Sequence, residues 1–212
     1  MTNRVFVTGI GMITPLGVDT AETWNNLING ISGADYIKSF DAAHLETRFA
    51  AEVTDFEPTD FIPKKSARHM DRFAQFALVA AQEAAWQANF RPEKEDLTTV
   101  TTIIGSAVGG LLSLSEQFSV LTERGANRVS PFLVPKMLSD MAASQVSMAM
   151  GTKGVNYSPV SSCSSGAEAI GQAWGMIKRG EAAMAIAGGA EAPISPIGIA
   201  GFNACQALSK RN

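Results

Sequence analysis

One cysteine stands where a run of small and β-branched residues meets an apolar, helix-like pattern. Residues 157–180 read YSPVSSCSSGAEAIGQAWGMIKRG, and Cys163 lies at the junction. A thiol at the first turn of a helix is close to unpaired backbone N–H groups, which together with the helix dipole favour a negative charge on sulfur. The same N–H groups can stabilise the oxyanion that forms when a thiolate attacks an acyl carbonyl. The pattern indicates a nucleophile for acyl transfer, and the alternative is an inert, buried small residue.

Other kinds of chemistry find little support in the chain. The second cysteine, Cys205, is 42 positions away and is interpreted as structural, in a loop after Phe202; the two histidines, His44 and His69, lie far from both cysteines. This spacing argues against a disulfide framework or a zinc site. The stretch GTKG is no P-loop, GIGMIT is no dinucleotide fingerprint, and no GxSxG is present.

Composition narrows the class of protein further. Hydrophobic residues make up 46% of the 212 residues and charged residues 17%, which is typical of a globular chain with a sizeable core. The net charge of −3 gives no overall basic footprint for nucleic acid. The sequence shows neither a signal peptide nor an apolar run long enough to span a membrane. We therefore predict a cytoplasmic protein with reduced thiols.

Short apolar runs alternate with longer helical patterns along the chain. This order predicts an α/β fold with a mixed, mainly parallel sheet flanked by helices, in one domain. The helix after Cys163 is apolar over most of its circumference, so we expect it to be buried on several sides. The predicted strands cover residues 4–11, 98–110, 154–162 and 182–191, and the predicted helices cover 19–30, 70–90, 130–151 and 163–179.

The motif around Cys163 has a recognisable form. SSCSSGAEAIGQA, followed by AIAGGAEAPISPIGIAGFNACQALSKRN, resembles the active-site region of the elongating β-ketoacyl-acyl carrier protein synthases. Further matches in the same order are VFVTGIGMITPLG, KKSARHMDRFAQFAL, GSAVGG and VSPFLVPKML, so the resemblance covers essentially the whole chain. It implies a thiolase-like fold, which in the full enzyme has α-β-α-β-α layers built from two similar halves.

The resemblance also implies a reaction. Cys163 would accept the acyl chain as a thioester, and its backbone N–H would form part of the oxyanion hole. A malonyl group on acyl carrier protein would then be decarboxylated and joined to that chain in fatty acid elongation. No metal or redox cofactor is implied, because both acyl groups arrive on the phosphopantetheine arm of acyl carrier protein.

Binding residues carry over from the same motifs. Val108 and Phe202 match positions in or near the acyl pocket, and Leu133 matches a side chain that enters it from the partner subunit. The basic residues Lys65, Arg68 and Arg128 match the surface that docks acyl carrier protein. The strand within 154–162 would pair with its counterpart, which implies a homodimer.

The chain ends at ALSKRN, whereas the family continues through two catalytic histidines, a lysine and a glycine-rich loop. We therefore expect residues 1–212 to be the N-terminal half, with the C-terminal half absent. We expect this half alone to be inactive and only marginally stable. Three alternatives stay open: a non-catalytic scaffold or chain-length partner, a polyketide-type ketosynthase, and a thiolase-like enzyme acting on coenzyme A esters. Retention of Cys163 argues against the first.

Overall fold

The computed structural model describes residues 4–212 and has a three-stranded parallel sheet at its centre. Strand β3 (Val100–Gly105) lies between β4 (Asn156–Tyr157) and β5 (Met184–Gly189). All six residues of β3 pair with β5, whereas β4 forms only two residue pairs with β3. The predicted α/β class with parallel strands is confirmed.

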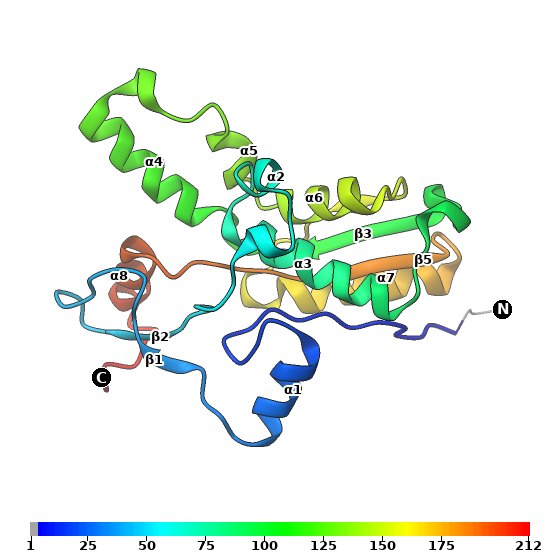
Figure 1. Ribbon diagram of the computed structural model, residues 1–212, viewed down its shortest axis with the longest axis horizontal. Helices are drawn as coiled ribbons and strands as arrows, with labels where there is room; N and C mark the ends of the chain where they lie inside the picture. Colours follow the sequence, from blue (N-terminus) through cyan, green and yellow to red (C-terminus); the bar gives the residue numbers. More distant parts are fainter. Residues whose placement is uncertain (1–3) are drawn as a thin grey trace.

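Helices cover both faces of this sheet (Figure 1). Helices α3 (Arg72–Gln87) and α6 (Met141–Met150) pack on one face, and α7 (Ser165–Arg179) packs on the other. β3 is buried on both faces, and its sequence VTTIIG is accordingly a run of β-branched residues up to Gly105, without regular alternation of polar and apolar side chains. Its side chains nevertheless alternate: Val100 and Ile104 face α3 and α6, and Ile103 faces α7.

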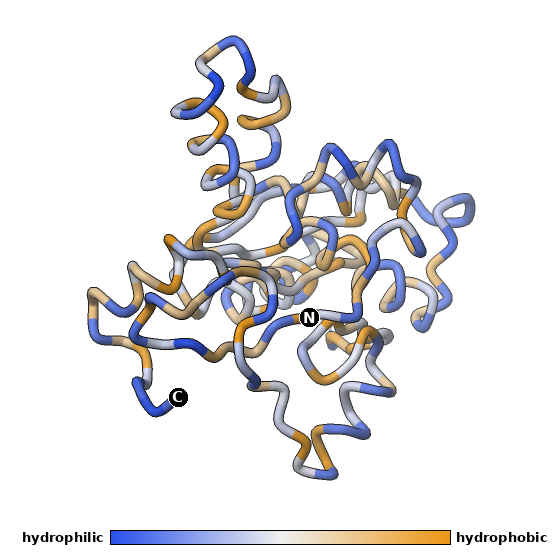
Figure 2. Tube along the Cα trace, turned by 60° about the vertical axis from the view of Figure 1, so that its left-hand side comes forward, coloured by the Kyte–Doolittle hydropathy of each residue, from blue (hydrophilic) through white to orange (hydrophobic). Residues whose placement is uncertain are grey.

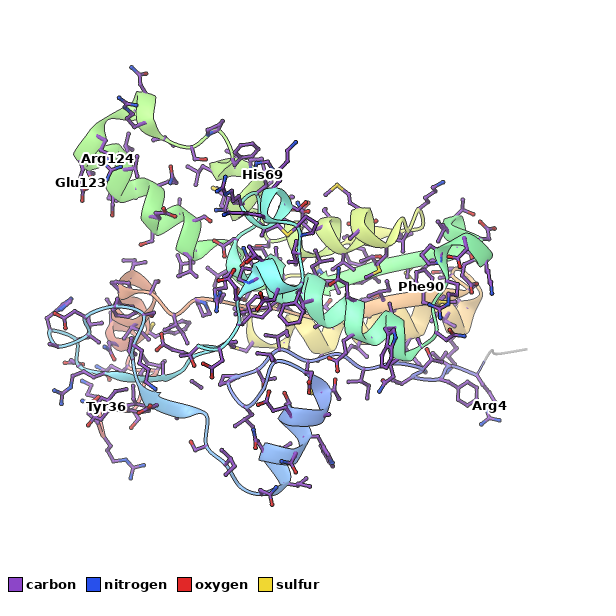
Figure 3. The ribbon with its side chains drawn as sticks, viewed as in Figure 1. Arg4, Tyr36, His69, Phe90, Glu123 and Arg124 are labelled. Carbon is purple, nitrogen blue, oxygen red and sulfur yellow. The ribbon has the colours of Figure 1, made fainter. Side chains whose placement is uncertain are left out.

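A helical arm leaves the sheet after β3. It consists of α4 (Leu111–Arg124), the short helix η4 (Ala126–Arg128) and α5 (Leu133–Met137). Figure 3 shows Glu123 and Arg124 at the far end of α4, away from the sheet. Apolar and polar stretches alternate along the arm in Figure 2, and Phe118 is 65% exposed.

Asp71 connects this arm to the core. Its side chain is 2% exposed and caps α3 by accepting from Phe73 N at 3.4 Å. The second carboxylate oxygen accepts from Ser113 N, in the first turn of α4, at 2.8 Å. One buried carboxylate therefore satisfies the starts of two helices, whose first N–H groups have no partner within their own helix.

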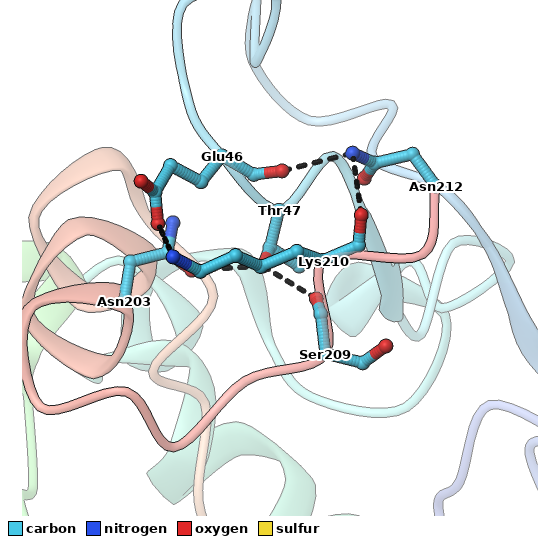
Figure 4. Close-up of polar contacts among 6 residues, drawn as sticks. All are labelled: Glu46, Thr47, Asn203, Ser209, Lys210 and Asn212. Carbon is cyan, nitrogen blue, oxygen red and sulfur yellow. Dashed lines mark hydrogen bonds and ion pairs between the residues drawn. The ribbon is translucent and has the colours of Figure 1, made fainter.

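The remaining elements surround the sheet and its covering helices. They include α1 (Thr20–Ile28), which Asp19 caps, and the antiparallel pair β1 (Ala34–Tyr36) and β2 (Phe49–Ala51). The end of the chain is held against the segment before β2 (Figure 4), where the Thr47 hydroxyl lies 2.7 Å from Ser209 O. The other short elements are α2 (Lys64–Ala67), α8 (Pro196–Ala204), η1 (Pro58–Asp60), η2 (Pro92–Lys94) and η3 (Leu97–Thr99).

The predicted first strand, residues 4–11, is wrong: these residues form no strand in the described chain. The segment instead runs across α3, where Ile10 N donates to Gln87 Oε1 at 2.6 Å. Just beyond the segment, Met12 N donates to Glu83 Oε2 at 2.9 Å. Within residues 4–11, the N–H group of Ile10 is therefore bound by a helix side chain and not by a neighbouring strand.

Three other boundaries differ from the prediction. The helix predicted over 130–151 is two helices, because Leu138 is extended (ψ 135°) between α5 and α6. The strand predicted over 154–162 contains only the two residues of β4, since Pro159 has no N–H to donate to a ladder. The strand predicted over 98–110 ends at Gly105. The prediction also omitted α4 and α8.

The expectation that α7 is buried on several sides is also wrong for the described chain. Ala169 is fully buried and Ala173 is 4% exposed against the sheet, but Ile170 is 56% and Trp174 50% exposed. One face of α7 is thus packed on β3 and β5, while the opposite face presents large apolar side chains.

Candidate functional site

Cys163 lies at the carboxyl ends of the parallel strands. It is the middle residue of the short helix η5 (Ser162–Ser164), which leads directly into α7. The arrowhead of β3 in Figure 1 points toward this edge, from which α4 also begins. Ligand sites in open parallel sheets form outside the carboxyl ends of the strands, so Cys163 is at the edge where a substrate site is expected. Its side chain is exposed.

Serine side chains hold the turn that presents Cys163. Ser165 is 3% exposed; its hydroxyl accepts from Ser161 N at 3.0 Å and donates to Ser162 O at 2.7 Å. Ser162 has φ 55°, a left-handed conformation that is costly for a residue with a Cβ. The turn is therefore sharp, and the buried Ser165 stabilises it.

Glycines allow the start of α7 to touch the ends of two strands. A Cβ at Gly105 would lie 2.2 Å from Ser165 O, and a Cβ at Gly189 would lie 2.7 Å from Gly166 Cα. Neither distance is compatible with a side chain, so the close approach requires glycine. The position of Cys163, two residues before Ser165, thus depends on the backbone packing of α7 against β3 and β5.

Tyr157, at the end of β4, lies in the segment that leads to the turn. Burial, and secondly the negative charge of Glu168 in the first turn of α7, raise the pKa of Tyr157 above its usual value. The phenol of this β4 residue therefore stays protonated at physiological pH and is available as a hydrogen-bond donor.

Val108 lies in the loop that follows β3, and its side chain is 43% exposed. Ala107 N and Val108 N both donate to Glu191 Oε2, at 2.7 and 3.2 Å. On the other side the loop touches α5, since Gly110 N donates to Met137 O at 3.1 Å. Leu133 is the half-buried first residue of that helix, so the structure brings the elements carrying Val108 and Leu133 together.

Phe202 and Cys205 both belong to the end of α8, not to a loop. Phe202 is 43% exposed, and Cys205 is the C-cap residue, whose Sγ lies 3.0 Å from Gly201 O. Cys205 is also exposed, so exposure alone does not distinguish the two thiols. What distinguishes Cys163 is its place at the start of a helix.

The three predicted docking cations lie on two separate short elements. Lys65 in α2 and Arg68 at its C-cap are exposed, and Arg128 is exposed in η4 of the arm. The rings of His69 and Phe132 stack with centroids 3.9 Å apart, which joins the α2 segment to the base of the returning arm. All three cations are free of ion pairs in the described residues.

Two carboxylates that hold elements around the site, Glu191 and Asp71, were not found from the sequence. Glu191 ends the AGGAE run, and Asp71 lies in RHMDRF, so both motifs were visible, but only the folded chain shows what the carboxylates bind. Across residues 4–212, no group of His, Cys, Asp and Glu side chains is arranged to hold a metal ion. No described helix is long and apolar enough to cross a membrane.

Comparison with known proteins places this arrangement in a family. The family model described as "Beta-ketoacyl synthase, N-terminal domain" matches residues 2–212. The chain is 41% identical over 206 residues, 97% of its length, to the 3-oxoacyl-[acyl-carrier-protein] synthase 2 of Staphylococcus aureus (strain COL). It is 40% identical over 209 residues, 99% of its length, to the synthase of that name from Synechocystis. The match covers 50% of each of those proteins, so the chain spans about half their length.

Solved structures agree with the sequence comparison. A β-ketoacyl synthase from Burkholderia phymatum STM815 superposes with a TM-score of 0.85 and 30% identity, over 100% of this chain and 52% of the other. The predicted resemblance is thereby confirmed at the level of family and fold. The chain belongs to the β-ketoacyl synthases and carries their N-terminal domain.

Proposed function

We propose that this chain is the N-terminal half of a 3-oxoacyl-[acyl-carrier-protein] synthase and that Cys163 carries the growing acyl chain in fatty acid elongation. The observation that carries the proposal is the exposed thiol in a sharp turn at the carboxyl edge of the sheet, directly before a long helix. Its relatives of 40–41% identity bear the name of this activity.

Two steps follow from the placement of the thiol. The Cys163 sulfur attacks the thioester carbonyl of acyl-acyl carrier protein, and the phosphopantetheine thiol leaves as the new thioester forms. Decarboxylation of malonyl-acyl carrier protein then gives a carbanion that attacks the acyl-cysteine carbonyl and releases the Cys163 thiolate. The second step needs acid–base groups of the second half that the resemblance implies. Without that second half, residues 1–212 would accept an acyl group on Cys163 but would not complete the condensation.

Substrate binding falls to the residues around the carboxyl edge. In this proposal Val108 and Phe202 line the acyl pocket and Leu133 contributes to the pocket of a partner subunit. Lys65, Arg68 and Arg128 dock the acidic carrier protein, whose phosphopantetheine arm brings the substrate. Exposure of all three cations supports this role, because a docking cation must be free to meet its partner.

A cytoplasmic homodimer completes the proposal. β4 leaves one side of the sheet unpaired in the described chain, and Val155 and Val160 beside it are 48% and 62% exposed. An unpaired strand edge next to apolar side chains is suited to pairing with a second copy. The two cysteines are both free, which is compatible with a reducing compartment.

The test is acylation of the full-length protein. Incubated with acyl-acyl carrier protein alone, the protein should gain the mass of one acyl group, and peptide mapping should place it on Cys163. C205A should still be acylated and C163A should not. Addition of malonyl-acyl carrier protein should then yield 3-oxoacyl product from the wild type and C205A only. Acylation of C163A at wild-type level would refute the assignment of the nucleophile.

A further inference from the structure

We propose that Glu191 is a positioning residue that holds the loop bearing Val108 and thereby sets which acyl lengths the Cys163 site accepts. The inference rests on the proposed function. Glu191 follows β5, and the loop follows β3, so the carboxylate links the carboxyl ends of two neighbouring strands. Its Oε2 accepts from Ala107 N at 2.7 Å and from Val108 N at 3.2 Å.

Ser106 links the Glu191 carboxylate to the next residue of the loop, so that the hydrogen bonds form a ring. Its side chain is 1% exposed; the hydroxyl donates to Glu191 Oε1 at 3.1 Å and accepts from Gly109 N at 3.2 Å. The N–H groups of three consecutive residues, 107 to 109, are thus all bound by side-chain oxygens of Glu191 and Ser106. The loop conformation therefore depends on the Glu191 carboxylate and on the Ser106 hydroxyl that is bonded to it.

The far end of the loop is also held. A Cβ at Gly109 would lie 2.7 Å from Met137 O, and one at Gly110 would lie 2.2 Å from Lys136 O, so both glycines are pressed against α5. Val108 lies between these two attachments and has its backbone N–H held by Glu191. Its side chain is exposed at the edge where Cys163 lies, rather than packed in the core.

In this arrangement the Val108 side chain is held in a fixed position at the end of the proposed acyl pocket. A hydrophobic pocket discriminates between chains by one methylene only if its end wall stays in place, because each methylene changes the selectivity by about 10–200-fold. Loss of the Glu191 carboxylate frees the N–H groups of Ala107 and Val108 and removes the acceptor of the Ser106 hydroxyl, so the Val108 side chain can move away. Longer acyl chains then fit, while the thiol chemistry at Cys163 is untouched.

The experiment measures kcat/KM of the full-length protein for a short and a long acyl-acyl carrier protein. In E191A, the ratio of kcat/KM for the long acyl chain to kcat/KM for the short one should rise by about 10-fold or more, the lower limit of the selectivity that one methylene gives. E191Q should stay close to the wild-type ratio, since its amide oxygen can accept from both backbone N–H groups and its NH₂ can donate to Ser106 Oγ. V108A should show a raised ratio, and E191A should add nothing further in the V108A background.

Two results would overturn the role of Glu191: a folded E191A with the wild-type ratio, or a full additional rise when E191A is combined with V108A. If E191A does not fold, S106A decides, because it removes the ring's hydroxyl and should raise the ratio by a smaller factor; an unchanged ratio overturns the inference. A wild-type protein that elongates no acyl chain refutes the proposed function instead, and the two failures are therefore distinguishable.

Discussion

Replacement of Gly105 by alanine should displace the candidate nucleophile. The added Cβ would lie 2.2 Å from Ser165 O and 2.4 Å from Ser165 C, both backbone atoms at the start of α7. Ordinary contact begins near 3.4 Å, so α7 must move by about 1.2 Å to relieve the overlap. Because Cys163 is only two residues from Ser165, its sulfur moves with the helix.

The size of the effect follows from this displacement. Forcing an extra methyl group into packed structure costs about 1–3 kcal/mol of unfolding free energy. A shift of about 1 Å at reacting groups lowers the rate by about 100-fold. G105A should therefore fold, with reduced stability, and transfer an acyl group to Cys163 about 100 times more slowly than the wild type.

Gly188 provides the matched control. It lies in β5 opposite Ile104 in the strand register, and a Cβ there meets no atom within 4 Å in the described chain. G188A should leave the acylation rate unchanged and raise stability by up to about 1 kcal/mol, since alanine restricts the unfolded chain more than glycine.

The assay compares single-turnover acylation rates by intact mass, together with denaturant unfolding, for the wild type, G105A and G188A in the full-length protein. A G105A rate within twofold of the G188A rate would show that contact between β3 and α7 does not position Cys163. Equal losses in the two variants would mean that any change at the strand ends is harmful, which would also refute the reasoning.

Three further predictions concern the surroundings of the site. D71A should lower the unfolding free energy by about 1–3 kcal/mol, because it leaves Ser113 N without its acceptor, and D71N should cost less; denaturant titration measures both, and equal losses would contradict the capping role. T47V removes the hydroxyl that lies 2.8 Å from Asn203 Oδ1 and 2.7 Å from Ser209 O, so limited proteolysis should cut residues 207–212 faster than in the wild type; unchanged cleavage would show that other contacts hold this end. Tyr157 has its pKa raised by burial, so the unfolded chain releases the phenolic proton first, and stability present below about pH 10 is lost as the pH rises through the folded pKa. Absorbance titration should show a tyrosine step above pH 10 that disappears in Y157F, and a step that persists in Y157F would exclude Tyr157 as its source.

Local patterns explain which elements could be predicted. α3 and α7 carry apolar residues at spacings of three and four, and β3 and β5 are short apolar runs bounded by turn residues. The same rule would have found α4, where Leu111, Leu114, Phe118 and Leu121 recur at helical spacing. The start of the helix near Cys163 could be predicted in the same way, because a run of small residues ends there and apolar residues at helical spacing begin.

Partners distant in the chain decided the rest. Residues 4–11 look like a strand, but their neighbour is α3, some 70 positions later, and helix side chains accept from this stretch and from Met12. The exposure of Ile170 and Trp174 likewise depends on what lies opposite α7, which the period of the helix does not show.

The sequence by itself therefore determined the α/β class, the main strands and helices, and the cysteine most suited to chemistry, because these follow from periods of two to four residues. Only the tertiary structure decided how the turn at Cys163 is held. It also decided that Glu191 binds the Val108 loop, since that contact joins residues 83 to 85 positions apart. Such contacts form because the carboxyl ends of neighbouring parallel strands lie side by side, and a local sequence pattern does not show which strands are neighbours.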